Sequence, residues 1–304
     1  MRKAIVYGNG ESRIGHYVYG EFPNDEYVTW GCNAIYRDID VMNLVSVDYG
    51  MQLEIYESGY AHAHKCWFGD WNIIPAYFEG DENILVNTGI GSKEPEINRE
   101  IYGHASSRLI RNLKSNGVSA KDVTKVILTQ LHFDHSGGST SLDREGKLIP
   151  TFPKAKYVVQ KSAWDEAFNQ DERLLPAYGH PVDHLNILEE RDMVEFLDGN
   201  TEVSPGVFCE MIDGYSEGHQ IVKVNAGSER IVYLSELIPA PSHLPLAYIT
   251  AYDRYPDQTL EMKRRIIAEC EQEGWLMVFA HGYKEYAGYI KRMNQTLALE
   301  PIAI

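Results

Sequence analysis

Short hydrophobic runs, each bounded by glycine, proline, asparagine or aspartate, recur along the chain from residue 53 onward. Runs of this length between turn-forming residues are typical of buried β-strands. The pattern predicts strands at 53–56, 71–78, 83–89, 125–129, 157–159, 207–212, 220–224, 230–234 and 276–280.

Three longer segments between these runs have the composition and spacing of helices. In the first, 108–116, the apolar residues fall on one face and Gly117 provides a C-terminal stop. The other two predicted helices span 161–168 and 259–273. Strands with interspersed helices favour a layered α/β sandwich. Because no low-complexity linker interrupts this pattern, we expect residues 53–304 to form one domain.

Residues 1–52 have a different pattern. Their β-type runs at 17–19, 27–30 and 44–47 are short and are broken by Gly, Pro, Asn and Asp. This pattern predicts an N-terminal arm or a pair of hairpins, an extension that would suit contacts between subunits. We therefore expect a homo-oligomer, with a hetero-oligomer as the alternative.

Composition narrows the class of protein. The chain has 304 residues, 44% of them hydrophobic, and 28 Lys plus Arg stand against 44 Asp plus Glu, for a net charge of −16. The hydrophobic content excludes a disordered chain. The acidic excess argues against a nucleic-acid partner, because binding to phosphates requires a concentrated basic face. No run approaches the roughly 18 apolar residues of a membrane span, so no membrane partner is expected.

The N-terminus and the cysteines bear on the cellular compartment. After Arg2 and Lys3, polar residues and glycines interrupt any apolar core of a signal peptide. The cysteines have no short paired spacing, which favours unpaired thiols over disulfides. They are Cys32, Cys66, Cys209 and Cys270. We expect a cytoplasmic protein.

One polar segment directly follows the predicted strand at 125–129. It contains His132, Asp134 and His135 and ends in two glycines. Imidazole and carboxylate groups at this spacing suit zinc or iron. A polar loop with incidental histidines is the alternative, but three more candidates occur at matching places. His219 precedes a predicted strand, and Glu236 and His281 follow the ends of two others, which predicts a metal centre assembled from distant segments.

These residues resemble the metallo-β-lactamase-fold hydrolases over about residues 53–300, and within them the branch of the N-acyl-homoserine lactonases. The resemblance implies a four-layer αββα sandwich with an N-terminal extension. It also implies two divalent metal ions, zinc first, with iron or manganese as alternatives. By resemblance, His132 and His219 belong to the first metal site, Asp134, His135 and His281 belong to the second, and Glu236 is the bridging carboxylate.

Three positions depart from the pattern of that family. Gln130 stands in place of the first histidine of the His-x-His-x-Asp-His signature, and its amide oxygen is a weaker ligand than imidazole. Glu236 stands in place of the bridging aspartate. Asn87 stands in place of an aspartate that orients metal ligands from outside the first shell. Together they indicate that the first metal site is weakened, altered or lost.

The resemblance implies a metal-dependent hydrolase that uses a metal-activated hydroxide. Asp134 would both bind metal and carry a proton to the leaving group. We expect a small, neutral, partly apolar substrate: a lactone or ester first, an activated aryl ether or a phosphotriester otherwise. Candidate substrate-binding residues are Phe133, His184, Tyr215 and Tyr248. The competing hypothesis is a catalytically weakened or helper subunit of a hetero-oligomeric metallohydrolase.

Overall fold

The computed structural model describes residues 82–93, 108–169, 178, 181–226, 229–282, 284–293 and 296–302, and the backbone of four strands nearer the N-terminus. The chain divides into two compact units. The first comprises residues 1–80 with 226–228, and the second comprises residues 81–225 with 229–304. The predicted boundary at residue 53 and the predicted strands at 53–56 and 71–78 lie outside the described residues.

The first unit contains a four-stranded sheet in the order β1-β2-β3-β4. Its strands are β1 (Lys3–Tyr7), β2 (Tyr27–Cys32), β3 (Asn43–Ser46) and β4 (Lys65–Phe68). Every pair is parallel. The prediction of paired hairpins was therefore wrong for β2 and β3, because parallel neighbours require a crossover and hairpin strands are antiparallel. The predicted strand at 17–19 lies outside the described residues.

The smaller sheet of the second unit has the order β10-β9-β6-β5, and all three pairs are parallel. Its strands are β5 (Asn83–Val86), β6 (Val123–Ile127), β9 (Lys156–Gln160) and β10 (Val194–Leu197). Alternate residues face opposite sides of a strand. Tyr157 and Val159 accordingly join one hydrophobic core, and Val158 joins another.

The larger sheet runs in the order β11-β12-β13-β14-β15-β16-β17. Its strands are β11 (Thr201–Ser204), β12 (Val207–Met211), β13 (Gln220–Ala226), β14 (Glu229–Tyr233), β15 (Leu276–Val278), β16 (Ala287–Met293) and β17 (Thr296–Ile302). Strands β14 and β15 are parallel, whereas β11-β12-β13 and β15-β16-β17 are antiparallel. A separate antiparallel pair joins β7 (Thr140–Leu142) to β8 (Leu148–Pro150).

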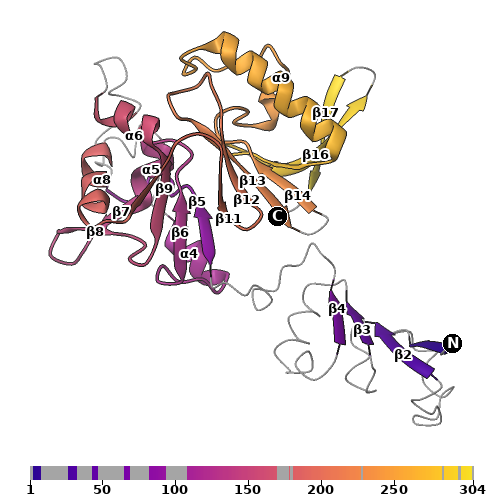
Figure 1. Ribbon diagram of the computed structural model, residues 1–304. Helices are drawn as coiled ribbons and strands as arrows, with labels where there is room; N and C mark the ends of the chain where they lie inside the picture. The colour runs from indigo at the N-terminus through magenta and orange to yellow at the C-terminus, as the bar shows by residue number, and fades with distance from the viewer. Residues whose placement is uncertain are drawn as a thin grey trace. The chain divides into compact units, whose positions relative to one another are not determined.

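Helices cover the outer faces of both sheets (Figure 1). Helices α4 (Leu109–Ser115), α6 (Lys161–Phe168) and α8 (Pro181–Glu190) contribute to the core that lies against β6 and β9. Helix α9 (Pro256–Glu273) packs on β14 and β15 through a second core. A third core, which includes Ile127 and Val222, lies between the two sheets. These four layers confirm the predicted αββα sandwich.

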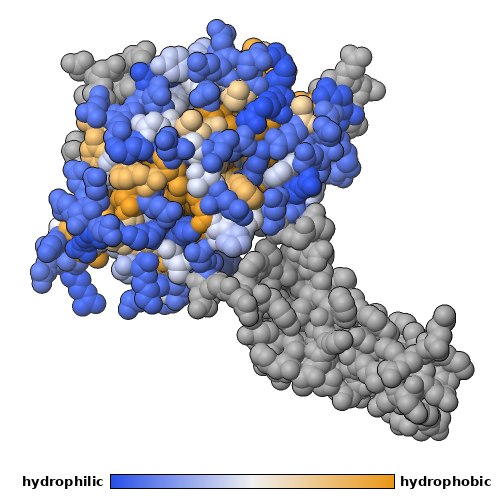
Figure 2. Space-filling model, in the orientation of Figure 1, coloured by the Kyte–Doolittle hydropathy of each residue, from blue (hydrophilic) through white to orange (hydrophobic). Residues whose placement is uncertain are grey.

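The surface agrees with this layering (Figure 2). In that view hydrophilic residues dominate the periphery of the second unit, and apolar residues show mainly in a central band.

Among the described residues, no helix is long and apolar enough to cross a membrane. The described cysteines, Cys209 and Cys270, are buried and unpaired, as their spacing predicted for these two.

Gly137 and Gly138 let the loop after β6 pack closely against the segment after β5. The loop contains α5 (Phe133–Ser136) and a single 3-10 turn, η4 (Gly137–Ser139). The Gly138 amide donates to the Gly89 carbonyl over 2.9 Å, and a Cβ atom on Gly138 would collide with the Thr88 carbonyl oxygen. Glycine is required here by close backbone approach, which places the segment that follows β5 directly beside α5.

We expect Gly138→Ala to lower the free energy of unfolding by about 1–3 kcal/mol, the usual effect of overpacking an interior. The measurement is urea unfolding followed by circular dichroism. Ser141→Ala, three residues further along the chain, removes an atom and adds none, so it should stay within about 0.5 kcal/mol of the wild type. Equal stability of the two variants would contradict the close approach at Gly138.

Candidate metal centre

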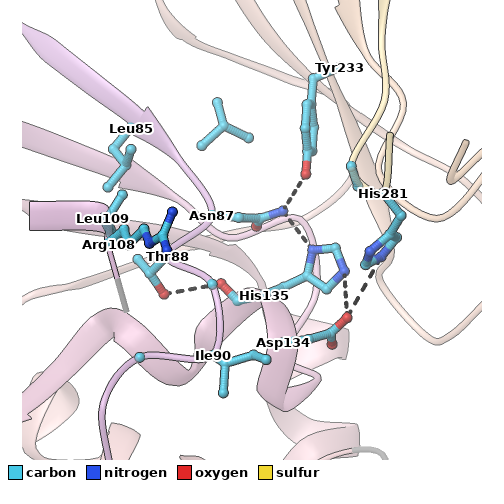
Figure 3. Close-up of a pocket in the computed structure, with 14 residues that line it drawn as sticks. Leu85, Asn87, Thr88, Ile90, Arg108, Leu109, Asp134, His135, Tyr233 and His281 are labelled. Atoms are coloured by element: carbon cyan, nitrogen blue, oxygen red, sulfur yellow. Dashed lines mark hydrogen bonds and ion pairs between the residues drawn. The ribbon is translucent and has the colours of Figure 1, made fainter. Parts of the chain in front are cut away.

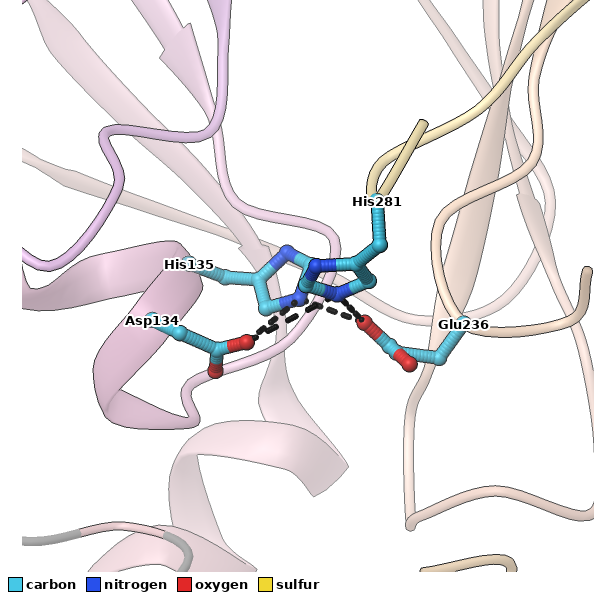
Figure 4. Close-up of side chains that lie close together, drawn as sticks. All are labelled: Asp134, His135, Glu236 and His281. Atoms are coloured by element: carbon cyan, nitrogen blue, oxygen red, sulfur yellow. Dashed lines mark hydrogen bonds and ion pairs between the residues drawn. The ribbon is translucent and has the colours of Figure 1, made fainter. Parts of the chain in front are cut away.

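Residues after the ends of β6, β14 and β15 converge on one point (Figure 4). Asp134 and His135 lie on α5, Glu236 comes shortly after β14, and His281 follows β15. One ligand atom from each of these four residues lies within 4.8 Å of the others, and no other such group occurs in the described part of the chain. Two imidazoles and two carboxylates are a donor set that fits a divalent metal ion.

Glu236 contacts both histidines of this group. Its Oε1 accepts hydrogen bonds from His135 Nε2 at 2.7 Å and from His281 Nε2 at 2.5 Å. Asp134 Oδ2 lies farther away, 3.4 Å from His135 Nε2 and 3.7 Å from His281 Nε2. The Glu236 carboxylate is buried, whereas His281 is half-exposed. The group therefore has a buried side at Glu236 and an open side at His281.

The two hydrogen bonds to Glu236 also shift the pKa values of Glu236 and His281. Burial by itself would raise the pKa of Glu236, but the hydrogen bonds from His135 and His281 outweigh burial and hold the pKa far below its usual range. The hydrogen bond to Glu236 raises the pKa of His281, against the opposing effect of burial. The charged forms of Glu236 and His281 thus stabilise each other.

Asn87 lies behind His135, at the end of β5 (Figure 3). Its Oδ1 accepts the backbone N–H of Thr129 over 2.9 Å. Its Nδ2 lies 2.8 Å from His135 Nδ1 and 3.2 Å from the Tyr233 hydroxyl. Asn87 has a left-handed backbone with φ of 59°, a conformation that asparagine tolerates better than most residues. The Asn87 backbone N–H also donates to the Ile127 carbonyl over 2.9 Å, so both the backbone and the amide of Asn87 are held in place.

The residues predicted for a first metal site, His132 and His219, are not members of the four-residue group. His132 and His219 are both buried, and burial lowers their pKa values to about 4 and about 3. His132 Nδ1 lies 3.2 Å from the Tyr215 hydroxyl, and His219 Nε2 accepts the backbone N–H of Glu236 over 3.3 Å. Both rings are thus neutral at pH 7. One nitrogen of each ring contacts a protein group, whereas Nδ1 of His219 is buried without a hydrogen-bond partner among the described residues.

Gln130 is turned away from a ligand role in this arrangement. Its Oε1 accepts the backbone N–H of His132 over 3.1 Å, and its Nε2 is buried with no hydrogen-bond partner in the described part of the chain. An amide N–H group cannot ligate a metal ion. Gln130 therefore presents a donor, not an acceptor, to its surroundings, and its predicted role as a ligand stays a prediction.

A cavity of about 470 Å³ opens beside the four-residue group. Asp134, His135 and His281 reach it, and apolar side chains such as Leu85 and Leu109 form another part of its wall. Arg108 contributes the only Lys or Arg side chain among the described lining residues. The cavity is therefore partly apolar and carries the candidate ligands on one wall.

A match to a family model over most of the sequence identifies the family of this chain. The sequence profile of the metallo-beta-lactamase superfamily matches residues 69–281, more than half of the chain. The chain belongs to the metallo-beta-lactamase superfamily. This membership and the αββα layering agree with the resemblance read from the motif residues.

Curated relatives of this superfamily member match about half of its length. The N-acyl homoserine lactonase AiiA of Bacillus thuringiensis subsp. kurstaki is 27% identical over 165 residues, which are 50% of this chain and 57% of that protein. An N-acyl homoserine lactonase of Bacillus cereus is 26% identical over 156 residues, which are 51% of this chain and 52% of that protein. The chain thus spans little more than half the length of these relatives.

Solved structures share the fold. A probable metal-dependent hydrolase from Staphylococcus aureus superposes with a TM-score of 0.62 at 24% identity, over 73% of this chain and 79% of the other. AidC, a dizinc quorum-quenching lactonase, superposes with a TM-score of 0.61 at 20% identity, over 73% of this chain and 76% of the other. At these identities the likeness establishes the fold alone.

The four predicted substrate-binding residues do not line the described cavity. Phe133 begins α5, Tyr215 packs between His132 and His219, His184 lies on α8, and Tyr248 is exposed. Substrate contact by these residues stays a prediction. Thr129, Tyr233 and Arg108 were not predicted as site residues, yet Thr129 and Tyr233 contact Asn87 and Arg108 lines the cavity. Thr129 and Tyr233 lie at or just after the ends of strands, so the position that identified the candidate ligands could also have identified these two residues.

The paired charges of Glu236 and His281 predict how the stability of the metal-free protein depends on pH. The lowered pKa of Glu236 adds stability above about pH 4.5, and the raised pKa of His281 adds stability that is complete below pH 6.5 and is lost as the pH rises through its folded-state value. We expect Glu236→Gln to destabilise the protein most between these limits, with a smaller difference at higher pH.

Urea unfolding of chelator-treated wild type and Glu236→Gln at several pH values measures this difference. Glu145→Gln, an exposed position, is the matched control and should follow the wild type throughout. A difference between wild type and Glu236→Gln that does not change with pH would contradict the assigned charges.

Proposed function

We propose that this protein is a metal-dependent hydrolase of ester- or lactone-type bonds in small, neutral, partly apolar molecules. The observation that carries the proposal is the convergence of Asp134, His135, Glu236 and His281 beside the cavity, in a member of the metallo-beta-lactamase superfamily. Relatives at 26–27% identity are N-acyl homoserine lactonases, which supports a lactone or ester over an activated aryl ether or a phosphotriester.

The four converging residues would hold a divalent ion, zinc first, with iron or manganese as alternatives. Such an ion, when bound, lowers the pKa of a water molecule and polarises a substrate carbonyl. A second ion near His132 and His219 would lack a ligand from Gln130, so we expect it to bind more weakly. We expect the protein to form a homo-oligomer through its N-terminal unit, with a hetero-oligomer as the alternative.

The protein's own groups divide the remaining work. Asp134 is more exposed than Glu236 and reaches the cavity, so it is placed to receive a proton and deliver it to a leaving group. Glu236, buried and paired with two histidines, is suited to holding charge, not to exchanging protons with solvent. The wall formed by Leu85, Ile90 and Leu109 suits an apolar part of the substrate.

A second candidate function is a catalytically weakened or helper subunit of a hetero-oligomeric metallohydrolase. The specific observation that favours it is the orientation of Gln130, whose oxygen is taken by a backbone N–H. By contrast, the complete group of four candidate ligands favours an active enzyme. Metal content and activity of the isolated chain distinguish the two functions.

We expect the purified chain to bind Zn²⁺ and to hydrolyse members of a panel of lactones and aryl esters. His281→Ala should reduce both Zn²⁺ affinity and turnover at least as much as the roughly 10- to 100-fold loss that follows removal of an outer-shell partner, because it removes a ligand itself. The measurements are elemental analysis, competition with a chelator, and initial rates.

His243→Ala is the matched control, since His243 is also a half-buried histidine but lies outside the ligand group. It should bind metal and turn over substrate as the wild type does. A wild-type chain that binds Zn²⁺ yet hydrolyses nothing in the panel would favour the helper subunit. A chain that binds no divalent metal would overturn both the centre and the proposed reaction.

A further inference from the structure

The hydrogen bonds of Asn87 bear on which nitrogen of His135 is free to bind metal. We infer that Asn87 places the ring proton of His135 on Nε2, the atom that faces Glu236 and Asp134, and thereby weakens metal binding at this centre. The inference rests on the proposed function in that the four-residue group is a metal site. Asn87 is a positioning residue, because it acts through His135.

The orientation of the Asn87 amide is fixed by a group that can only donate. The backbone N–H of Thr129 lies 2.9 Å from Asn87 Oδ1, and a backbone amide has no acceptor on nitrogen. Turning the amide over would place Nδ2 against this N–H, so that two buried donors faced each other. Asn87 is only 8% exposed, so water cannot readily satisfy either group.

The fixed amide determines the tautomer of the neighbouring imidazole. Asn87 Nδ2 is a donor and lies 2.8 Å from His135 Nδ1, so Nδ1 must accept. A neutral imidazole with Nδ1 as acceptor carries its proton on Nε2. That proton is directed at Glu236 Oε1, 2.7 Å away. The hydrogen bonds on the two sides of the ring therefore agree on the same tautomer.

This tautomer is the wrong one for ligation. A histidine that binds metal through Nε2 uses the lone pair of that atom and usually donates its other ring N–H to an acceptor. Here the group opposite Nδ1 is itself a donor. Metal binding would have to break the contact between Asn87 and His135, or turn the amide against the Thr129 N–H. Either change lowers the affinity of the centre.

A carboxylate at position 87 would reverse the effect, and the Thr129 hydroxyl, which accepts from Asn87 Nδ2 over 2.8 Å, would turn to donate instead. The Thr129 backbone donates already, and the Thr129 and Tyr233 hydroxyls, which lie 3.1 Å from Oδ1 and 3.2 Å from Nδ2, can each rotate to donate. His135 Nδ1 would then carry a proton and donate it to the carboxylate. Asparagine and aspartate have nearly the same shape, so Asn87→Asp changes the polarity of one atom.

The experiment combines ring-proton assignment with metal affinity. Long-range ¹H–¹⁵N correlation spectra of the full-length metal-free protein, above about pH 8 where an ordinary imidazole is neutral, should show His135 protonated on Nε2 and not on Nδ1 in the wild type. In Asn87→Asp, Nδ1 should gain a proton. Zn²⁺ affinity, measured by competition with a chelator, should rise about 10- to 100-fold.

Two further variants separate the tautomer from charge and from packing. Asn83→Asp makes the same substitution at the other end of β5, where the amide contacts the Asp122 carbonyl, and should leave Zn²⁺ affinity near the wild-type value. Asn87→Ala removes the opposing donor and should bind Zn²⁺ at least as tightly as the wild type. Weaker binding by Asn87→Ala would mean that Asn87 supports the ligand.

The inference is overturned if wild-type His135 carries its proton on Nδ1, a result that needs no variant to fold. It is also overturned if Asn87→Asp and Asn83→Asp change Zn²⁺ affinity equally. Neither readout uses a substrate, so failure of the proposed hydrolase would leave both results interpretable. Loss of hydrolysis with the predicted tautomer would reject the reaction alone.

Discussion

The pairing of one buried carboxylate with two histidines is the interaction on which the rest of the centre depends. Glu236 Oε1 accepts hydrogen bonds from His135, on α5, and from His281, in the segment after β15. These two histidines belong to parts of the chain that are held by different sheets. A buried carboxylate without such donors would be strongly unfavourable, so the three side chains have to come together when the two sheets pack.

The backbone around these residues is shaped to bring them together. Asn87 and Ser235 are two of only three described non-glycine residues with positive φ, and both lie just past strand ends. Their side chains both reach Thr129, Asn87 through its amide and Ser235 through a hydroxyl contact of 2.8 Å. Thr129 therefore ties the ends of β5, β6 and β14 to one another. Unusual backbone conformations concentrated at one place are typical of functional sites.

Hydrophobic runs predicted much of the second unit because its buried strands and helices have strong local signals. The helix at 161–168 was predicted to the residue, and the strands β5, β6, β9 and β12–β15 were found with small differences at their ends. The short strands β7, β8, β10 and β11 were not predicted. Strands β16 and β17 were missed because Lys291, Arg292 and Glu300 interrupt the apolar pattern of an antiparallel pair at the edge of the sheet. The parallel pairing of β2 and β3 was missed because pairing depends on distant segments, which no local pattern encodes.

The candidate ligands could be predicted from strand ends, but their hydrogen bonds could not. Sequence identified Asn87 and Gln130 as departures from the pattern of the family, without saying what each amide does. In the structure both follow one rule. A backbone N–H takes the amide oxygen, from Thr129 at Asn87 and from His132 at Gln130, so the amide nitrogen is the group left to meet the other neighbours. The polarity of these two positions is set by the backbone of the loop after β6, and at Asn87 it places a donor against a histidine that needs an acceptor to bind metal through Nε2.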